Sequence, residues 1–145
     1  MAIERKARAT WTGDLRSGQG EFDLESSHAV EDEQVTFASR FEQPGGKTSP
    51  EELIAAAHAT CFSMALAFGL ANAGTPPEQL NTSATVGFQP GEGITKIALA
   101  VEGRVPGLDE EGFQAAAEGA KANCPVSKAL AGVPEITLDA KLAGQ

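Results

Sequence analysis

The sequence is poor in basic residues. It has 11 lysines and arginines against 20 aspartates and glutamates, so its net charge is −9 at neutral pH. Binding to a nucleic-acid backbone requires clustered lysine and arginine, and this composition therefore argues against a nucleic-acid partner. The same negative charge argues against docking on an anionic membrane surface.

The sequence also lacks a long uninterrupted hydrophobic run. Its most apolar stretch, residues 54–73, is broken by four polar residues, which are His58, Thr60, Ser63 and Asn72. That stretch is too polar and too rich in alanine to predict a membrane span. The opening segment MAIERKARATW has no apolar core of a secretion signal. We therefore expect a cytoplasmic protein with no membrane partner.

Cysteine is scarce, with Cys61 and Cys124 as the two examples. They lie far apart in the sequence, so they form no Cys-x-x-Cys motif and can meet only through the fold. Two cysteines in a cytosolic chain are more often catalytic, metal-binding or inert than joined in a structural disulfide.

The length of 145 residues and the hydrophobic fraction of 41% suit one domain over residues 1–145. Alternating patterns predict strands over residues 6–13, 33–43 and 135–143, and a hairpin over residues 80–105. An early hairpin is also expected, with Gly18 and Gly20 in its turn. Helices are expected over residues 108–124, with Asp109 as N-cap, and after Pro125. This order predicts an α+β fold, with the hairpins antiparallel.

The segment SPEELIAAAHATCFSMALAFGLANAG predicts the main helix. Ser49 is a suitable N-cap, Pro50 suits the first helical position and Glu52 completes a capping box. Gly74 is a suitable stop. Residues 53–71 are apolar on nearly every side, so we expect a helix buried all round. In so short a chain this requires a sheet on one side and another helix or another subunit on the other.

Cys61 lies in the middle of this helix, and its chemistry depends on ionisation. A thiol reacts as the thiolate, and burial in an apolar helix raises its pKa. The helix dipole helps only in the first turn, so a reactive Cys61 needs a cation from elsewhere. Arg40 and Arg16 are the early candidates. Without such a cation, Cys61 is an inert core residue and Cys124 an ordinary thiol at a helix break.

Glu51 bears on how such a site is built. It precedes Cys61 by ten residues on one helix, which corresponds to roughly 15 Å at the helical rise. A glutamate and an arginine do not comfortably bridge that distance in one chain, so a site that used both would be easier to build from two copies. The alternative interpretation of Glu51 is that it only complements the helix dipole.

Histidines offer a different reading. His58 lies one turn before Cys61 on the same face, and together with Cys61, Cys124 and His28 it would supply two cysteines and two histidines for a metal. The spacings are unlike those of zinc fingers, so we expect a packed, hydrogen-bonded His58 instead.

The motifs SPEELIAAAHATCFSMAL, NCPVSK and a closing ITLD strand, together with ATWTGDLRSGQG, SRFEQPGG and GEGITKIALAVEGRVPGLD, resemble the OsmC/Ohr family of thiol-dependent peroxidases, and the OsmC branch in particular. The resemblance covers nearly the whole chain. It implies an OsmC-like α+β fold in which strands of antiparallel sheets wrap around two long central helices in an intertwined homodimer.

The resemblance also implies roles for individual residues. Cys61 matches the peroxidatic cysteine, Cys124 the resolving cysteine, Arg40 the arginine beside the thiolate and Glu51 the glutamate that orients this arginine. In the Ohr branch the arginine comes from the early hairpin, so Arg16 remains the alternative.

The implied activity is reduction of organic hydroperoxides to alcohols, with a dithiol or lipoylated protein as reductant and with no metal or organic cofactor. Two other functions stay open on the residues alone. One is a non-catalytic carrier of apolar ligands on the same fold, and the other is a structural metal-binding protein.

Overall fold

The computed structural model describes residues 1–144 and confirms the mixed α+β class, with two small sheets and four helices among these residues. The chain divides into two compact units, Met1–Leu53 and Ile54–Gln145, and each is described by itself. The single domain expected over residues 1–145 stays a prediction.

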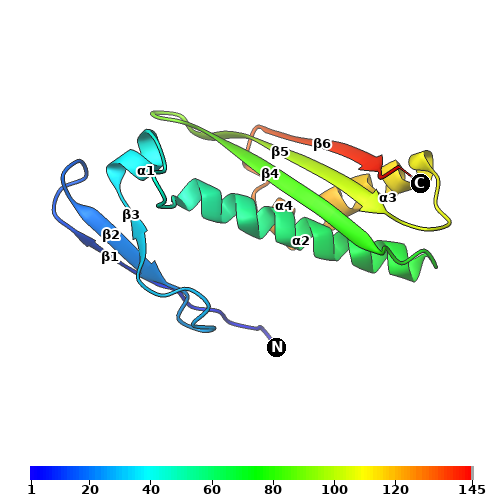
Figure 1. Cartoon of the computed structure of the whole chain (residues 1–145), viewed down its shortest axis with the longest axis horizontal. Coiled ribbons are helices and arrows are strands. Elements are labelled where there is room, and N and C mark those ends of the chain that lie inside the picture. The colour runs from blue at the N-terminus through cyan, green and yellow to red at the C-terminus, as the bar shows by residue number, and fades with distance from the viewer. Residues whose placement is uncertain (145) are drawn as a thin grey trace. The chain divides into compact units, whose positions relative to one another are not determined.

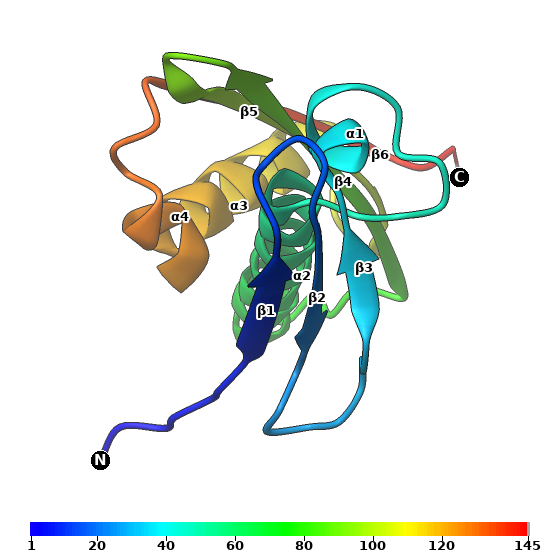
Figure 2. The same ribbon diagram turned by 90° about the vertical axis from the view of Figure 1, so that its left-hand side faces the viewer.

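The first unit contains an antiparallel sheet of β1 (Arg8–Thr12), β2 (Gln19–Asp23) and β3 (Glu33–Val35), in that order (Figure 2). The predicted early hairpin is present, and Gly18 lies in its turn, where a Cβ would come within 2.3 Å of a backbone oxygen. Gly20 was expected in the turn as well, but it lies within β2 opposite Trp11. A Cβ on Gly20 would meet the Trp11 ring at 2.4 Å, so the glycine provides room for this indole.

The strand predicted over residues 33–43 is wrong beyond Val35. The chain turns there into the short helix α1 (Phe37–Phe41). The Thr36 hydroxyl accepts a hydrogen bond from the Ser39 amide, and the Ser39 hydroxyl accepts one from the Thr36 amide. This reciprocal capping box starts a helix where alternating Val35 and Phe37 suggested a strand. Arg40 therefore stands in the last turn of a helix and not at the end of a strand.

The main helix, α2 (Pro50–Asn72), begins and ends close to the predicted positions. The Ser49 hydroxyl accepts a hydrogen bond from the Glu52 amide at 3.2 Å, as expected of an N-cap. In a full capping box the Glu52 carboxylate would accept from the Ser49 amide. It accepts instead from the Thr48 hydroxyl, so only the Ser49 half of the expected capping box forms. Beyond the helix, Gly74 adopts a positive φ of 89°, which suits a helix C-terminus.

One side of α2 contributes to the core and another side does not. Phe62, Leu66 and Leu70 recur every fourth residue and are buried, whereas Met64 and Phe68 are 68% and 70% exposed. The expectation of a helix buried all round is therefore wrong for the chain on its own, because the sheet and helices of the second unit cover only one side. By length and composition alone, α2 is long and apolar enough to cross a membrane. Core helices of soluble proteins meet the same two criteria, so this is weak evidence for a membrane span.

The second unit contains a sheet of β4 (Gln79–Gln89), β5 (Gly93–Arg104) and β6 (Glu135–Leu142) (Figure 1). β4 and β5 form the predicted antiparallel hairpin, but β6 runs parallel to β5, which corrects the expectation of antiparallel pairing throughout. The physical reason lies in the connection. A parallel neighbour requires a long crossover, and α3 (Glu110–Asn123) with α4 (Pro125–Ala129) supplies it.

The core of this unit lies between the sheet and the two longer helices. Leu99 and Val101 from β5 pack with Phe113 and Ala117 from α3 and with the buried row of α2. Asp109 is the N-cap of α3, as predicted, because its carboxylate accepts from the Gly112 amide at 2.8 Å. The same core includes Cys124.

Candidate active site

The fold brings the two cysteines together. The Cys124 and Cys61 Sγ atoms lie 2.9 Å apart, and both residues are free thiols. Cys61 comes from the middle of α2, while Cys124 joins α3 to α4. Since a disulfide bond is about 2.0 Å long, these sulfurs would form one after an approach of about 1 Å. The pair can therefore exchange between dithiol and disulfide with little rearrangement.

The backbone on both sides holds Cys124 in place. Its amide donates to the Ala120 carbonyl at 2.8 Å, and its carbonyl accepts from the Lys128 amide at 3.0 Å. It is thus the C-cap of one helix and the N-cap of the next. Pro125 disfavours helical geometry at the preceding residue, and Cys124 accordingly has a ψ of 124°. The resulting break turns the thiol into the core beside α2.

The two thiols have opposite electrostatic tendencies. Burial raises the pKa of Cys61, and the hydrogen bond with Cys124 raises it further, against a weaker effect of the Val126 amide. Burial also raises the pKa of Cys124, but the contact with Cys61 and the polar groups of Ser127 outweigh it, so this pKa is lowered. Because burial and the contact with Cys124 both raise the pKa of Cys61, a reactive thiolate at Cys61 needs a further positive charge, as expected from the sequence.

Arg40 and Glu51, both named from the sequence, form an ion pair in the first unit. Arg40 Nη2 lies 2.9 Å from Glu51 Oε2, and Arg40 Nε donates to Oε1 at 3.1 Å. The last turn of α1 supplies the arginine and the first turn of α2 supplies the glutamate. Glu51 is buried, and its two-point contact orients the guanidinium more firmly than a single hydrogen bond would.

The alternative arginine, Arg16, has a different environment. Its guanidinium carbon lies 4.9 Å from the centre of the Phe37 ring, and that of Arg40 lies 5.4 Å from the centre of the Phe41 ring. The two rings stack on each other. Both arginines belong to the Met1–Leu53 unit, and both cysteines belong to the other unit. Because each unit is described by itself, the choice of Arg40 over Arg16 as the cation for Cys61 stays a prediction.

Sequence reasoning missed Ser127. The residue lies on α4 and its hydroxyl oxygen is 2.7 Å from Nε2 of His58. His58 is fully buried, which confirms the expectation of a packed, hydrogen-bonded histidine. The available signal was the spacing in CPVSK. Ser127 follows Cys124 by three residues, and residues three apart in a helix lie on the same face.

The metal-site alternative finds no support in the geometry of residues 1–144. Among them, no three histidine, cysteine, aspartate or glutamate side chains gather closely enough to hold a metal ion. His28 belongs to the first unit, where its Nδ1 lies 2.9 Å from Glu31. His58 and the two cysteines belong to the second unit.

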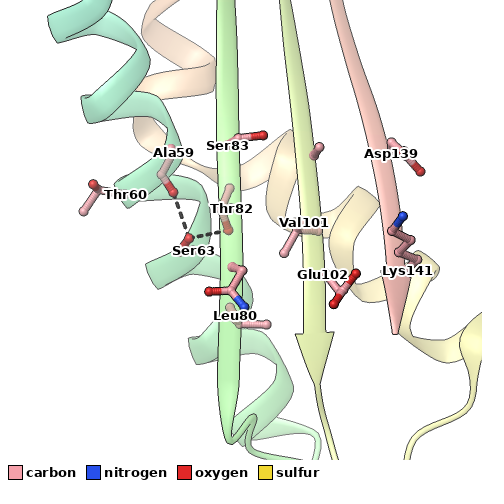
Figure 3. A pocket seen from close by; sticks show the side chains of 12 residues that line it. Ala59, Thr60, Ser63, Leu80, Thr82, Ser83, Val101, Glu102, Asp139 and Lys141 are labelled. Carbon is pink, nitrogen blue, oxygen red and sulfur yellow. Dashed lines mark hydrogen bonds between the residues drawn. The ribbon is translucent and has the colours of Figure 1, made fainter. Parts of the chain in front are cut away.

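A hollow of about 570 Å³ lies beside α2 and the second sheet (Figure 3). Ala59, Thr60 and Ser63 of the helix line it, and the Ser63 hydroxyl is hydrogen-bonded with the Ala59 carbonyl and with the Thr82 hydroxyl of β4. The thiol pair is not part of its lining. We therefore assign the candidate chemistry to the thiol contact and not to this hollow.

Comparison with known proteins points in one direction. A family model described as OsmC-like protein matches residues 43–139. The chain is 46% identical over 145 residues to Peroxiredoxin OsmC of Escherichia coli (strain K12), covering 98% of this chain and 99% of that protein.

Two solved structures resemble it in fold. One is an OsmC-like protein from Mycoplasma pneumoniae, with a TM-score of 0.75 and 15% identity. The other is an organic hydroperoxide resistance protein OsmC from Legionella pneumophila, with a TM-score of 0.65 and 23% identity. Each comparison covers 99% of this chain and 100% of the other.

Proposed function

The chain belongs to the OsmC family, and from this premise we propose that it reduces organic hydroperoxides to alcohols with its pair of cysteines. It is an enzyme, a thiol-dependent peroxidase, as is the relative named Peroxiredoxin OsmC. The observation that carries the proposal is the 2.9 Å contact between the Cys61 and Cys124 sulfurs. A carrier of apolar ligands would have no need of that contact.

The proposed first step uses Cys61. Its thiolate attacks the distal oxygen of the hydroperoxide, the O–O bond breaks, and the alkoxide leaves and takes up a proton as the alcohol. The sulfur is oxidised by two electrons to sulfenic acid. The apolar residues that follow Cys61 along α2 support fatty or aromatic hydroperoxides rather than hydrogen peroxide as substrates.

The second step uses Cys124. Its sulfur attacks the sulfenic sulfur of Cys61, the S–O bond breaks, and water is released after the hydroxide takes up the proton lost by Cys124. A dithiol, such as a lipoylated protein, then reduces the disulfide by thiol–disulfide exchange. This cycle requires a reducing compartment, in keeping with the predicted cytoplasmic location, and it uses no metal or organic cofactor.

Arg40 is the proposed cation for Cys61, with Glu51 as the residue that orients it. Support comes from the two-point contact between them, which presents a guanidinium of defined orientation. We propose that the complete site forms in an intertwined homodimer. Met64 and Phe68 are apolar residues of α2 that are exposed in the single chain. They support this assembly because exposed apolar patches commonly mark protein–protein interfaces.

One equivalent of cumene hydroperoxide tests the proposed function directly. We expect the intact mass of the reduced protein to fall by two hydrogens, and peptide mapping to link residues 61 and 124. The reason is that the sulfur pair is already within about 1 Å of bonding distance. An unchanged mass, or a disulfide that joins other partners, would rule the proposal out.

Replacing Arg40 by alanine should slow peroxide attack about 10- to 100-fold at neutral pH, the effect of losing one hydrogen bond to a charged group. The pKa of Cys61 should rise, so the rate should recover at higher pH. Stopped-flow measurement of single-turnover peroxide consumption gives both results. Arg16→Ala is the matched comparison and should leave the rate near that of the wild type. The reverse pattern would assign the role to Arg16.

A further inference from the structure

A second contact between α2 and α4 lies one helical turn from the thiols. His58 precedes Cys61 by three residues on α2. Ser127 follows Cys124 by three residues on α4. The His58 Nε2 and Ser127 Oγ atoms are 2.7 Å apart. All four residues belong to the unit Ile54–Gln145, so the sulfur contact and this polar contact join the same two segments of one compact unit.

The polar contact is buried, and burial is costly for a polar group that lacks a partner. His58 is fully buried, and Ser127 is 8% exposed. Nδ1 of His58 finds no hydrogen-bond partner among residues 1–144, so the contact from Nε2 is what compensates the burial of the ring. An aliphatic side chain would occupy this place without a polar atom to satisfy. What the polar pair adds is direction, because a hydrogen bond has a defined geometry and apolar packing has none.

α4 depends on such a contact because it is short. It spans the five residues Pro125–Ala129, and helices shorter than about 12 residues are marginal without tertiary contacts. Val126 packs against the hydrophobic core, and Ser127 bonds to His58. Cys124 is the N-cap of this helix. The orientation of α4 about its own axis therefore determines where the Cys124 sulfur lies.

We propose that the hydrogen bond between His58 and Ser127 is a latch that holds α4 against α2 and keeps the Cys124 sulfur beside Cys61. Both members of the latch are positioning residues for the resolving step, and this inference rests on the proposed function. In that step the S–S bond forms and the S–O bond of the sulfenic acid breaks. Hydroxide leaves with the electron pair and takes up the proton lost by Cys124, so no further reactant is needed.

The sulfur separation shows why a small displacement matters. Reacting atoms held about 3 to 3.5 Å apart are poised for reaction, and a displacement of about 1 Å can cost a factor of 100 in rate. The two sulfurs lie 2.9 Å apart. Release of the latch lets α4 move on its one remaining apolar contact with the core, made by Val126. The thiols then spend less time within reach of each other.

The experiment measures the two chemical steps separately. Reduced protein is mixed with one equivalent of cumene hydroperoxide, quenched in acid at increasing times and examined by intact mass. Sulfenic acid appears as a gain of one oxygen and the disulfide as a loss of two hydrogens. His58→Leu and Ser127→Ala should form the sulfenic acid at the wild-type rate, because Cys61 is unchanged. Their conversion to disulfide should be about 10- to 100-fold slower.

An equilibrium measurement reports the same positioning. Each protein is equilibrated with mixtures of reduced and oxidised glutathione, and the fraction of disulfide gives the effective concentration of one thiol at the other. In wild type the latch holds the two sulfurs together in the dithiol form. The effective concentration should therefore be about tenfold lower in Ser127→Ala.

Two variants distinguish positioning from general stability. Ser127→Thr keeps the hydroxyl, and its methyl group has room because Ser127 lines a hollow of about 300 Å³, so it should resolve near the wild-type rate. His58→Leu combined with Ser127→Ala leaves no member of the pair unpaired, and it should be more stable than Ser127→Ala in thermal unfolding. It should still resolve as slowly as Ser127→Ala, because the directional contact is missing.

Ser63→Ala is the matched control. It removes another buried-side hydrogen bond of α2, the 2.6 Å contact with the Thr82 hydroxyl, which leads to β4 and not to α4. We expect this variant to resolve at the wild-type rate and to show the wild-type effective concentration.

The outcomes are distinct. A wild type that forms neither sulfenic acid nor disulfide would end the proposed function. A wild type that reacts, with Ser127→Ala resolving at the same rate, would overturn the inference alone. So would a Ser127→Thr variant as slow as Ser127→Ala, an equally slow Ser63→Ala, or a double variant that regains the rate, since each of these reports packing and not the latch. If a single variant does not fold, the double variant carries the test.

Discussion

Cys61→Ser is expected to abolish peroxide reduction completely. A serine hydroxyl does not follow a thiolate along the oxidation ladder from sulfenic acid to disulfide, so neither chemical step remains. Cys61 is only partly buried and serine is close to it in size, so the fold should persist. The measurement is stopped-flow consumption of cumene hydroperoxide with a dithiol reductant, beside a circular dichroism spectrum of each protein.

The surviving thiol makes this variant informative. Cys124 is fully buried, and its pKa is lowered in part by its contact with Cys61. In Cys61→Ser it should remain reduced after exposure to hydroperoxide, which thiol counting under denaturing conditions would show. Peroxide consumption equal to that of the wild type would end the assignment of Cys61 as the reacting residue and, with it, the proposed mechanism.

Cys124→Ser is expected to consume one equivalent of hydroperoxide and then to stop as the Cys61 sulfenic acid. The first step needs only the Cys61 thiolate, whereas the second needs a sulfur at the position that now lies 2.9 Å away. Without added thiol, the variant should accumulate a species that dimedone labels, while the wild type proceeds to a disulfide that resists the label. Intact mass after labelling gives the stoichiometry.

A second substitution controls for burial. Cys124 belongs to the core cluster, and a serine hydroxyl there could lose stability through a poorly paired polar group. Cys124→Ala removes the sulfur without adding that hydroxyl, so it should give the same stalled sulfenic acid. Full turnover with a dithiol at the wild-type rate in both variants would contradict the resolving role of Cys124.

Local patterns were reliable where neighbours in the sequence decide the structure. The hairpin of β4 and β5 followed from alternation, and the starts of α2 and α3 followed from Ser49 and Asp109 as caps. The pattern failed at α1. Alternation through Val35 and Phe37 was typical of a strand, but the reciprocal capping of Thr36 and Ser39 starts a helix there. The prediction gave more weight to the longer hydrophobic pattern than to the short capping signal, and the capping signal decided the structure.

The candidate site divides in the same way. Cys61, Cys124, Arg40 and Glu51 were all named from the sequence through the family resemblance, whereas Ser127 was not. A serine three residues after a cysteine has no meaning until the partner helix is known. Only the packing of α4 against α2 places its hydroxyl 2.7 Å from His58.

The sequence by itself determined the family, the α+β class, most of the helices and strands, and the need of a thiol in an apolar helix for an outside cation. These follow from periodicity, caps and the desolvation of a charge, which act over a few residues. Tertiary structure decided that β6 runs parallel to β5, that one side of α2 stays exposed within the chain, and that Cys124 meets Cys61. These depend on residues far apart in the chain, whose pairing is set by how the whole core packs and not by any local pattern.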